Sequence, residues 1–323
     1  MNRALFRKCV IEARLLWAAL ALLLFAFCWV RVYIVSRLRM SQFAAIVEQL
    51  WDQFKDFSPV PLDELLSYTG RIAIGYNEPV VVVGVSLFAI ARGSDAVSGE
   101  LGRGTLELLL AQPVSRLQVL AHQAIVTVVG VLLLAVCTWG GTTAGIYTCS
   151  VTEEIPPPRL KLPGLNVEIP LSFRRGETVQ VPMRERTDPR FFLPGAVNLA
   201  CLGVALAGLS TLASAMDRYR WRTIGVVVGT YVVMLVLKLV GQAIHELPWL
   251  KALSLFTAYE PQKFISLAAR QPQAAWWLGQ YDAQGQWVGL GPVGYDLVLL
   301  GLGAGGYLAA AWAFCRRDLP APL

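Results

Sequence analysis

The sequence has few charged residues for its length. Asp, Glu, Lys and Arg make up 15% of its 323 residues, whereas soluble domains contain about 25%. Hydrophobic residues make up 55%. The charged residues cluster between long apolar runs instead of being spread over every helix face. This composition excludes an ordinary soluble domain and indicates a chain that lies largely in lipid.

Residues that bind metals or form disulfide frameworks are also scarce. The chain has two histidines and six cysteines, and no two cysteines form a C-x-x-C pair. Most of the cysteines lie in or beside apolar runs, where cysteine behaves as a small hydrophobic residue. We therefore expect no zinc site, no disulfide framework and no cofactor.

The common catalytic motifs are missing. There is no G-x-x-x-x-G-K-[ST] loop for ATP, no H-E-x-x-H and no G-x-S-x-G elbow. The net charge of +6 comes without an aromatic and basic nucleic-acid motif. Lys and Arg are also common in the cytoplasmic loops of membrane proteins. The sequence predicts a chain that is not an enzyme, does not itself bind ATP and does not bind nucleic acid.

What the sequence does contain is six long apolar runs. A helix needs about 20 apolar residues to cross the hydrocarbon core, and backbone groups in lipid must be paired within a helix or a closed barrel. The runs are too long and too uniformly apolar for barrel strands. They cover Leu15–Val35, Ile72–Ala91, Leu117–Ile146, Phe192–Ala215, Thr223–Ile244 and Val293–Phe314. We predict an all-α integral membrane protein with six transmembrane helices in a single domain, residues 1–323.

The basic residues predict the orientation of these spans. Lys and Arg close to span ends mark the cytoplasmic side, and six spans place both termini on one side. That side would carry Arg3, Arg7, Lys8, Arg14, Arg92, Arg103, Arg116, Arg218, Arg220, Arg222, Arg316 and Arg317. The outer segments also contain basic residues, but they are long and contain acids. We expect a multi-pass protein of the plasma or inner membrane with both termini in the cytoplasm.

The sequence predicts three outer insertions, residues 36–71, 149–190 and 245–292. Each has a residue pattern that predicts its own local structure. Met40–Phe57 has apolar residues at i, i+3, i+4 and i+7, which predicts an amphipathic helix. Residues 166–169 and 177–181 alternate in polarity around Arg174-Arg175-Gly176, which predicts a small β-hairpin. Leu255–Leu267 is too short to span and predicts a re-entrant or interfacial helix.

The segment between the second and third spans, residues 92–116, has the clearest local pattern. It includes Gly104-Thr105-Leu106-Glu107-Leu108-Leu109-Leu110 and then Pro113-Val114-Ser115-Arg116. Thr105 can cap a helix, and the helix dipole favours Glu107 in its first turn. Pro113 ends that helix and Ser115 can cap the next one. The pattern predicts a short helix beside the membrane, and an ordinary interfacial helix would satisfy it.

This segment resembles the signature of the type-2 permease family of ABC (ATP-binding cassette) transporters. Members typically have an acid, here Glu100, then a Gly-Thr-Leu-Glu-Leu-Leu-Leu and Pro-Val-Ser-Arg pattern between spans two and three. Ser254–Pro261, Ser210 and Ser214 are weaker similarities. Members often have a second acid where Gly102 stands and Gly-Lys where Ala121-His122 stands. The first departure leaves the charge pairing at this helix open.

The resemblance implies the membrane permease of an ATP-driven transporter, expected to be an exporter that works by alternating access. Its partners would be a separate ATPase subunit, a second copy or a similar permease, the bilayer and a transported substrate. The short helix would be a cytoplasmic coupling helix that docks on the ATPase. The residues carried over to this role are Glu100, Gly104, Thr105, Leu106, Glu107, Leu108, Pro113, Ser115 and Arg116. The alternatives are an ion-coupled carrier and a structural membrane anchor.

Three further features have two interpretations each. Lys238 lies inside the fifth span, where a mid-membrane charge costs roughly 2.5–3.5 kcal/mol. It either lines a substrate path or, as we expect, snorkels to the outer surface, because His245 and Glu246 lie just beyond it. Arg3–Arg14 is either an interfacial helix that touches the ATPase or a determinant of topology. The glycine pairs 225/229 and 301/305 are expected to serve packing within the chain rather than a dimer.

Overall fold

Six segments of the computed structural model are long and apolar enough to cross a membrane. The structure describes residues 3–38, 51, 60–154, 159–161, 168–170, 178–244, 246–281 and 286–317. The spans are α1 (Arg3–Arg37), the run from α4 (Tyr68–Ala73) to α6 (Glu100–Gly102), α8 (Arg116–Thr148), α9 (Leu193–Met216), α10 (Arg220–Ala243) and α13 (Pro292–Arg316). Their positions confirm the six predicted spans and the all-α membrane fold.

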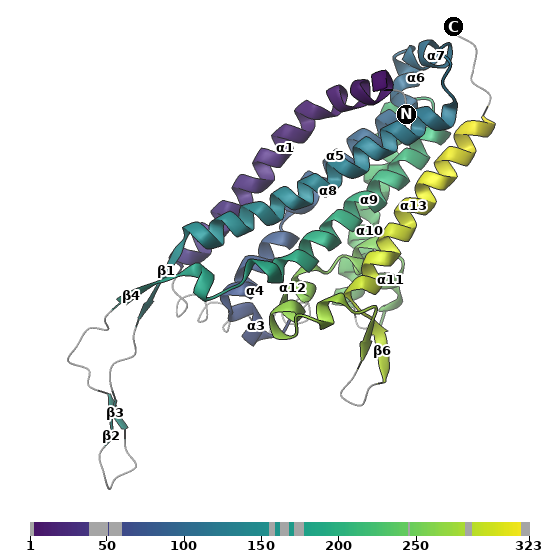
Figure 1. Ribbon diagram of the computed structural model, residues 1–323. Helices are drawn as coiled ribbons and strands as arrows, with labels where there is room; N and C mark the ends of the chain where they lie inside the picture. Colours follow the sequence, from purple (N-terminus) through teal and green to yellow (C-terminus); the bar gives the residue numbers. More distant parts are fainter. Residues whose placement is uncertain are drawn as a thin grey trace.

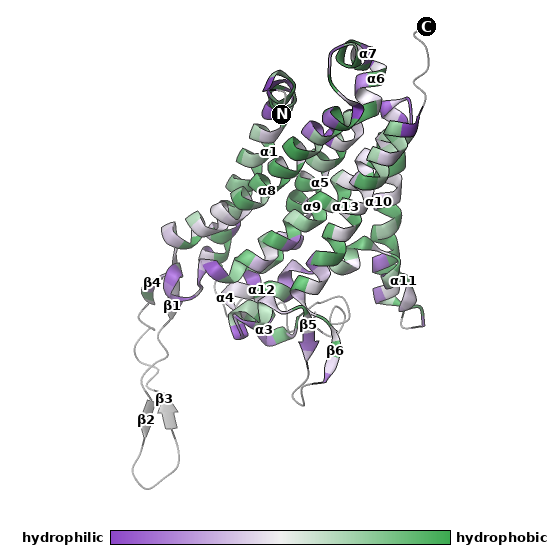
Figure 2. Ribbon diagram, turned by 45° about the vertical axis from the view of Figure 1, so that its right-hand side comes forward, coloured by the Kyte–Doolittle hydropathy of each residue, from purple (hydrophilic) through white to green (hydrophobic). Residues whose placement is uncertain are grey.

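The spans lie side by side in a bundle with two different ends (Figure 1). α1 begins and α13 ends at the end that carries α7 (Thr105–Leu110), which we call the α7 end. The opposite end carries α12 (Pro261–Arg270) and the strands, and we call it the α12 end. Figure 2 shows hydrophobic residues along the middle of the bundle and hydrophilic residues gathered toward its ends. This distribution suits an apolar layer with water on both sides.

α9 is the central helix of the bundle. In its most apolar stretch 83% of the residues are buried, whereas in that of α10 only 11% are. α9 packs against α5 (Pro79–Ser94), α8 and α13, and α1 packs along α8. α10 therefore lies at the edge of the bundle and leaves most of its surface uncovered by the chain.

Glycines bring α9 and α13 into backbone contact. A Cβ atom at Gly208 would lie 2.1 Å from the carbonyl oxygen of Gly303, and one at Gly306 would lie 2.6 Å from the carbonyl carbon of Gly208. The predicted glycine pairs do not have this role. Among the described residues, nothing lies within 4 Å of a Cβ at Gly225, Gly229, Gly301 or Gly305. The prediction that those pairs pack within the chain is therefore wrong, because small-residue spacing does not say which helix face meets a neighbour.

Replacement of Gly208 by valine should destabilise the bundle. The added side chain collides with the backbone of α13, which cannot move without separating two buried helices, and overpacking of this kind costs roughly 1–3 kcal/mol. The thermal unfolding midpoint of the detergent-purified chain measures the effect. Gly305→Val, on an open face of α13, is the control and should leave the midpoint unchanged. Equal midpoints for both variants would contradict the close crossing.

The second span is interrupted where Glu78 precedes Pro79. Proline lacks a backbone N–H and disfavours helix at the residue before it, so α4 passes through η2 (Ile74–Asn77) and α5 starts afresh at Pro79. The Glu78 carboxylate pairs with Arg31 of α1 at 3.0 Å. α5 then continues through a π-helical turn, η3 (Asp95–Gly99), into α6. An ion pair between α1 and the second span therefore lies at this break, near the α12 end.

The N-terminal stretch is not a separate interfacial helix. α1 runs without a break for 35 residues, which at 1.5 Å per residue is about 52 Å, longer than the ~30 Å hydrocarbon core. Leu5, Cys9 and Ala13 are buried together with Val119 and Val126 of α8. The first turns of α1 therefore extend past the apolar layer and pack beside the start of α8.

In the described part of the chain, the α12 end contains short elements and three two-stranded sheets. β1 (Ser150–Glu154) pairs with β4 (Thr178–Pro182), β2 (Arg159–Lys161) with β3 (Glu168–Pro170), and β5 (Gly279–Tyr281) with β6 (Trp287–Leu290), all antiparallel. The remaining short helices are α3 (Leu62–Leu66), α11 (Trp249–Ala252), η4 (Met183–Glu185), η5 (Pro189–Phe192), η6 (Leu255–Ala258) and η7 (Ala274–Trp276).

The outer insertions differ from the prediction in detail. The described parts of the two alternating stretches do not pair with each other, because each pairs with an earlier strand. The turn predicted at residues 174–176 lies outside the described residues. The single helix expected over Leu255–Leu267 is divided into η6 and α12. The amphipathic helix predicted over Met40–Phe57 lies outside the described residues except for Trp51.

Candidate functional site

α7 starts at a left-handed glycine. Gly104 has φ +68° and is the residue before the first helical turn, so glycine is required for a tight turn out of α6. Thr105 is therefore not the cap that the sequence predicts. Its hydroxyl donates instead to the Glu100 carboxylate, and also contacts the Glu100 carbonyl oxygen at 3.3 Å. The turn thus folds α7 back against the end of the second span.

α7 has an anchored face and an open face. Leu106 is buried in a cluster with Val97, Leu120 and Phe314, which belong to three different spans. Glu107 and Leu108 point away from this cluster, and Leu108 is 71% exposed. Among the described residues Glu107 has no ion-pair partner. The short helix is therefore anchored by the buried Leu106, and it exposes Glu107 and Leu108 at the end of the bundle.

The segment after α7 is fixed to the third and sixth spans. α7 ends at Leu110, and Pro113 lies exposed in the turn that follows. Ser115 caps α8 in a reciprocal capping box with Gln118, as predicted. Arg116 donates to the carbonyl oxygens of Phe314 at 3.0 Å and Arg317 at 2.6 Å. Arg116 thus ties the start of α8 to the end of α13 and does not belong to the open face of α7.

Glu100 joins α7 to α1. Its side chain is completely buried and pairs with Lys8 at 2.6 Å and with Arg103 at 3.3 Å, in addition to the Thr105 hydroxyl. A buried carboxylate is tolerated only when it is paired in this way. The charge pairing left open by Gly102 is therefore supplied by Lys8 of α1 and by Arg103 within the segment.

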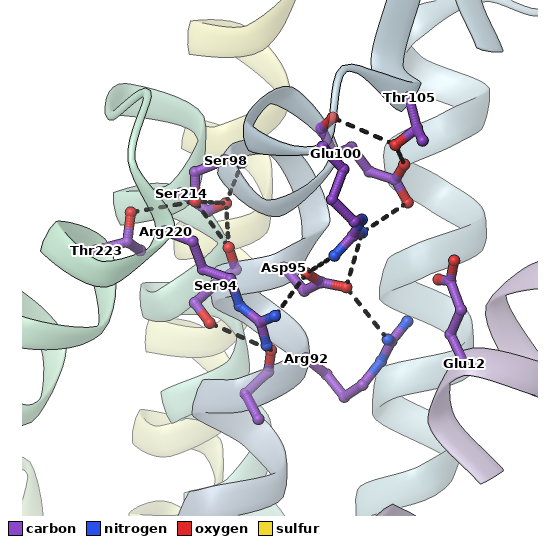
Figure 3. A network of polar contacts seen from close by, with 12 residues as sticks. Glu12, Arg92, Ser94, Asp95, Ser98, Glu100, Thr105, Ser214, Arg220 and Thr223 are labelled. Atoms are coloured by element: carbon purple, nitrogen blue, oxygen red, sulfur yellow. Dashed lines mark hydrogen bonds and ion pairs between the residues drawn. The ribbon is translucent and has the colours of Figure 1, made fainter. Parts of the chain in front are cut away.

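The Asp95 carboxylate forms ion pairs with three arginines at the end of the second span. Its carboxylate lies 2.7 Å from Arg103, 3.1 Å from Arg220 and 3.7 Å from Arg92. Figure 3 shows Arg92 and Arg220 approaching Asp95 from α5 and α10, with Glu12 of α1 nearby. The hydrogen bond that Arg103 donates to the Asp95 carboxylate raises the pKa of Arg103 above its usual value, so Arg103 stays charged. One carboxylate therefore links α5, the α6–α7 turn and α10.

Serine hydroxyl groups of α9 form hydrogen bonds with the backbone in and beside the π-helical turn η3 (Figure 3). The Ser214 hydroxyl oxygen accepts from the backbone N–H groups of Val97 at 3.1 Å and Ser98 at 2.9 Å, and donates to the carbonyl oxygen of Ser94 at 2.9 Å. Ser210, one turn earlier on α9, donates to Ile90 at 3.1 Å. These two serines fasten the central helix to the irregular end of the second span, and π-helical turns often occur at functional sites.

A comparison with protein families fits this arrangement. The model of the family described as ABC-2 family transporter protein matches residues 7–319. The chain belongs to this family. A comparison with curated proteins gave no significant match. The resemblance of the segment around Glu100–Arg116 is thereby confirmed at the level of the whole chain. This ABC-2 family protein is a multi-pass membrane component of an ABC transporter, of the kind that works with an ATPase.

Lys238 of this ABC-2 protein lies at the α12 end, far from α7 in the bundle. Its ammonium group contacts Glu260 at 2.7 Å and the carbonyl oxygens of Phe256 at 2.8 Å and Tyr259 at 3.2 Å. These acceptors occupy the three donors of a lysine. Lys238 also lines, together with Glu260, a cavity of about 310 Å³ between α5 and α10. The charge is therefore paired with the η6–α12 connection instead of facing lipid alone.

Sequence reasoning missed two carboxylates of this permease. Asp95 was not singled out, although it follows Arg92 by one helical turn at the end of a span, which is the one local signal of an ion pair. Asp296 lies within the predicted sixth span and accepts from the Asn198 amide at 2.7 Å. Asn198 in turn contacts the carbonyl of Ala258 and the backbone N–H of Glu260. The amide partner of Asp296 lies on another helix and is invisible in the sequence.

Proposed function

We propose that this chain is the permease subunit of an ATP-driven exporter and that α7 is its docking element for a separate ATPase. The two faces of α7 carry this proposal. Leu106 fixes the helix to the bundle, while Glu107 and the exposed Leu108 are presented outward. A partner that docks on α7 would therefore meet an acid and an apolar side chain on a helix whose other face is fixed in the bundle.

The ion pairs behind α7 provide a route for movement. Glu100 connects the α7 turn to α1, and Asp95 connects it to α5 and α10. A displacement of α7 by the ATPase would be passed to three spans through these paired charges. Alternating access would follow if those spans tilt as rigid bodies while α9 stays central. Residues 92–116 would form the coupling segment of a single transmembrane domain.

A second permease chain, identical or similar, would complete the membrane part. α10 is largely uncovered by its own chain, and so are both of its glycines at positions 225 and 229. We assign α7 and both termini to the cytoplasm and the α12 end to the outside. At the α7 end, Lys and Arg lie in short segments close to the span ends, whereas those of the α12 end lie mostly in long insertions that also contain acids. The membrane would be the plasma or inner membrane.

An ion-coupled carrier is the second candidate function. It is favoured by Asp296, a carboxylate buried in α13 whose one hydrogen bond among the described residues comes from the neutral Asn198 amide. Such a group suits proton exchange. This alternative requires no ATPase and predicts that α7 is dispensable.

Purification from native membranes separates the two functions. The full-length chain is extracted in several mild detergents and its partners are identified by mass spectrometry. We expect a stoichiometric ATPase with the wild type and its loss with Glu107→Arg, which reverses the charge on the open face of α7. Glu185→Arg, an exposed acid in η4 at the α12 end, makes the same charge change and should retain the ATPase. Recovery of the wild-type chain without an ATPase in every detergent would favour the carrier.

A further inference from the structure

A cavity of about 380 Å³ lies beside Asp95 at the α7 end of the spans. Arginines 92, 103 and 220 contribute to its wall, and so do Glu12 and Leu16 of α1 and Ala91 of α5. The cavity thus lies where α1, α5 and α10 meet the end of the apolar layer. Its lining combines three guanidinium groups, the carboxylates of Glu12 and Asp95, and a small apolar surface.

The positive charges around this cavity are not fully matched. Asp95 is the carboxylate that the three arginines share. The other two carboxylates of the cluster, Glu12 and Glu100, both pair with Lys8, and Glu100 also contacts Arg103. Four cations therefore face three carboxylates, which leaves one positive charge in a partly buried place. An anion would be attracted to it.

Two of the guanidinium groups also have unused donors. Among the described residues, the buried Nε atoms of Arg92 and Arg220 have no hydrogen-bond partner. The Arg92 side chain is only 5% exposed, and it lines the cavity. An unpaired buried donor costs about 1–3 kcal/mol, and an acceptor that enters the cavity would recover part of that free energy. Guanidinium groups match the oxygens of phosphate with paired hydrogen bonds.

The apolar part of the wall continues along the second span. Leu87 and Val83 lie one and two turns from Ala91 on the same face of α5, and both are half-exposed. A stripe of uncovered apolar residues therefore leads from the arginines toward the middle of the bundle. A ligand with a phosphate group and a hydrocarbon chain would satisfy both parts of the surface.

We propose that Arg92, Arg103 and Arg220 bind a phosphate group, and that the apolar stripe of α5 assigns it to an anionic phospholipid. The phosphate would supply acceptors to the free Nε donors and balance the unmatched charge. The acyl chains would lie along Leu87 and Val83. This site does not depend on the docking of an ATPase at α7, because a lipid would occupy the chain alone.

Native mass spectrometry of the detergent-purified, full-length chain tests the proposal. Phosphatidylglycerol is titrated against diacylglycerol, which lacks the phosphate, and against glycerol 3-phosphate, which lacks the acyl chains. We expect phosphatidylglycerol to bind at one site and diacylglycerol to bind at least about tenfold more weakly. Glycerol 3-phosphate that binds as tightly as phosphatidylglycerol would keep the phosphate site but overturn its assignment to lipid.

Variants locate the site. Arg220 is 41% exposed, so Arg220→Gln should fold, and we expect it to weaken phosphatidylglycerol binding about tenfold. Arg220→Lys keeps the charge without the paired donors and should lose less. Arg222→Gln makes the same charge change two residues away, at a side chain paired with Asp217, and should bind like the wild type. Equal affinities of wild type, Arg220→Gln and Arg222→Gln would overturn the proposal. A monodisperse size-exclusion profile confirms that each variant is folded.

Discussion

Replacement of Asp95 by asparagine is expected to lower the free energy of unfolding by about 3 kcal/mol, because it leaves a buried charge without its counter-ion. The largest share of this loss comes from Arg92, whose side chain is only 5% exposed. Arg103 and Arg220 are about two-fifths exposed, so solvent screens their share. Unfolding of the purified chain in mixed micelles of increasing denaturing detergent measures the change.

A double-mutant cycle separates the ion pair from other effects of the substitution. Arg92→Gln combined with Asp95→Asn removes both buried charges and should recover part of the stability lost in the single variant. Asp217→Asn is the matched control, because Asp217 contacts Arg222 at 3.6 Å near the surface. We expect that control to change stability by about 1 kcal/mol or less. If Asp95→Asn cost no more than Asp217→Asn, the charge on Asp95 would not stabilise the end of the second span.

The apolar runs contain enough information for the spans because the bilayer imposes a length and a composition on each of them. The bilayer does not determine how far a helix continues beyond it. The sequence predicts the first span over Leu15–Val35, whereas α1 begins at Arg3. Leu5, Cys9 and Ala13 recur every four residues, a helical signal that the basic residues between them obscured.

The candidate site was predictable only as a segment. The pattern around Gly104–Arg116 located α7, but it could not show that Thr105 bonds to Glu100 instead of capping the helix. The basic residues near span ends indicated topology, and the same residues form the network around Asp95. Arg220 reaches Asp95 from a different span. A sequence gives the sign of each charge but not the distance between two helices.

The strands show the same limit on the other side of the molecule. Residues 166–169 and 177–181 alternate as strands should, and strands are present at 168–170 and 178–182. Alternation with period two identifies a strand but does not name its partner. The partners, β1 and β2, precede these strands in the chain. The β2–β3 pair therefore lies between β1 and β4 in the sequence, and the four strands form two nested pairs instead of one hairpin.

The last expected result concerns the junction between α7 and α1. If α7 receives force from an ATPase, Glu100→Gln should uncouple the transporter, because it removes the ion pairs to Lys8 and Arg103 while the open face of α7 is unchanged. Transport in sealed vesicles should fall about tenfold, which corresponds to ~1.4 kcal/mol. ATP hydrolysis by the same complex should remain, and the ATPase should still copurify.

Two controls make this result specific to coupling. Glu12→Gln removes another carboxylate from Lys8, 3.5 Å away, without touching the α7 turn, and should transport normally. Glu107→Arg acts earlier and should lose the ATPase itself. The three variants thus distinguish loss of the partner from loss of transmission. A Glu100→Gln complex that transports at the wild-type rate would mean that movement of α7 reaches the spans through Leu106 and the apolar cluster around Phe314 instead of through the paired charges.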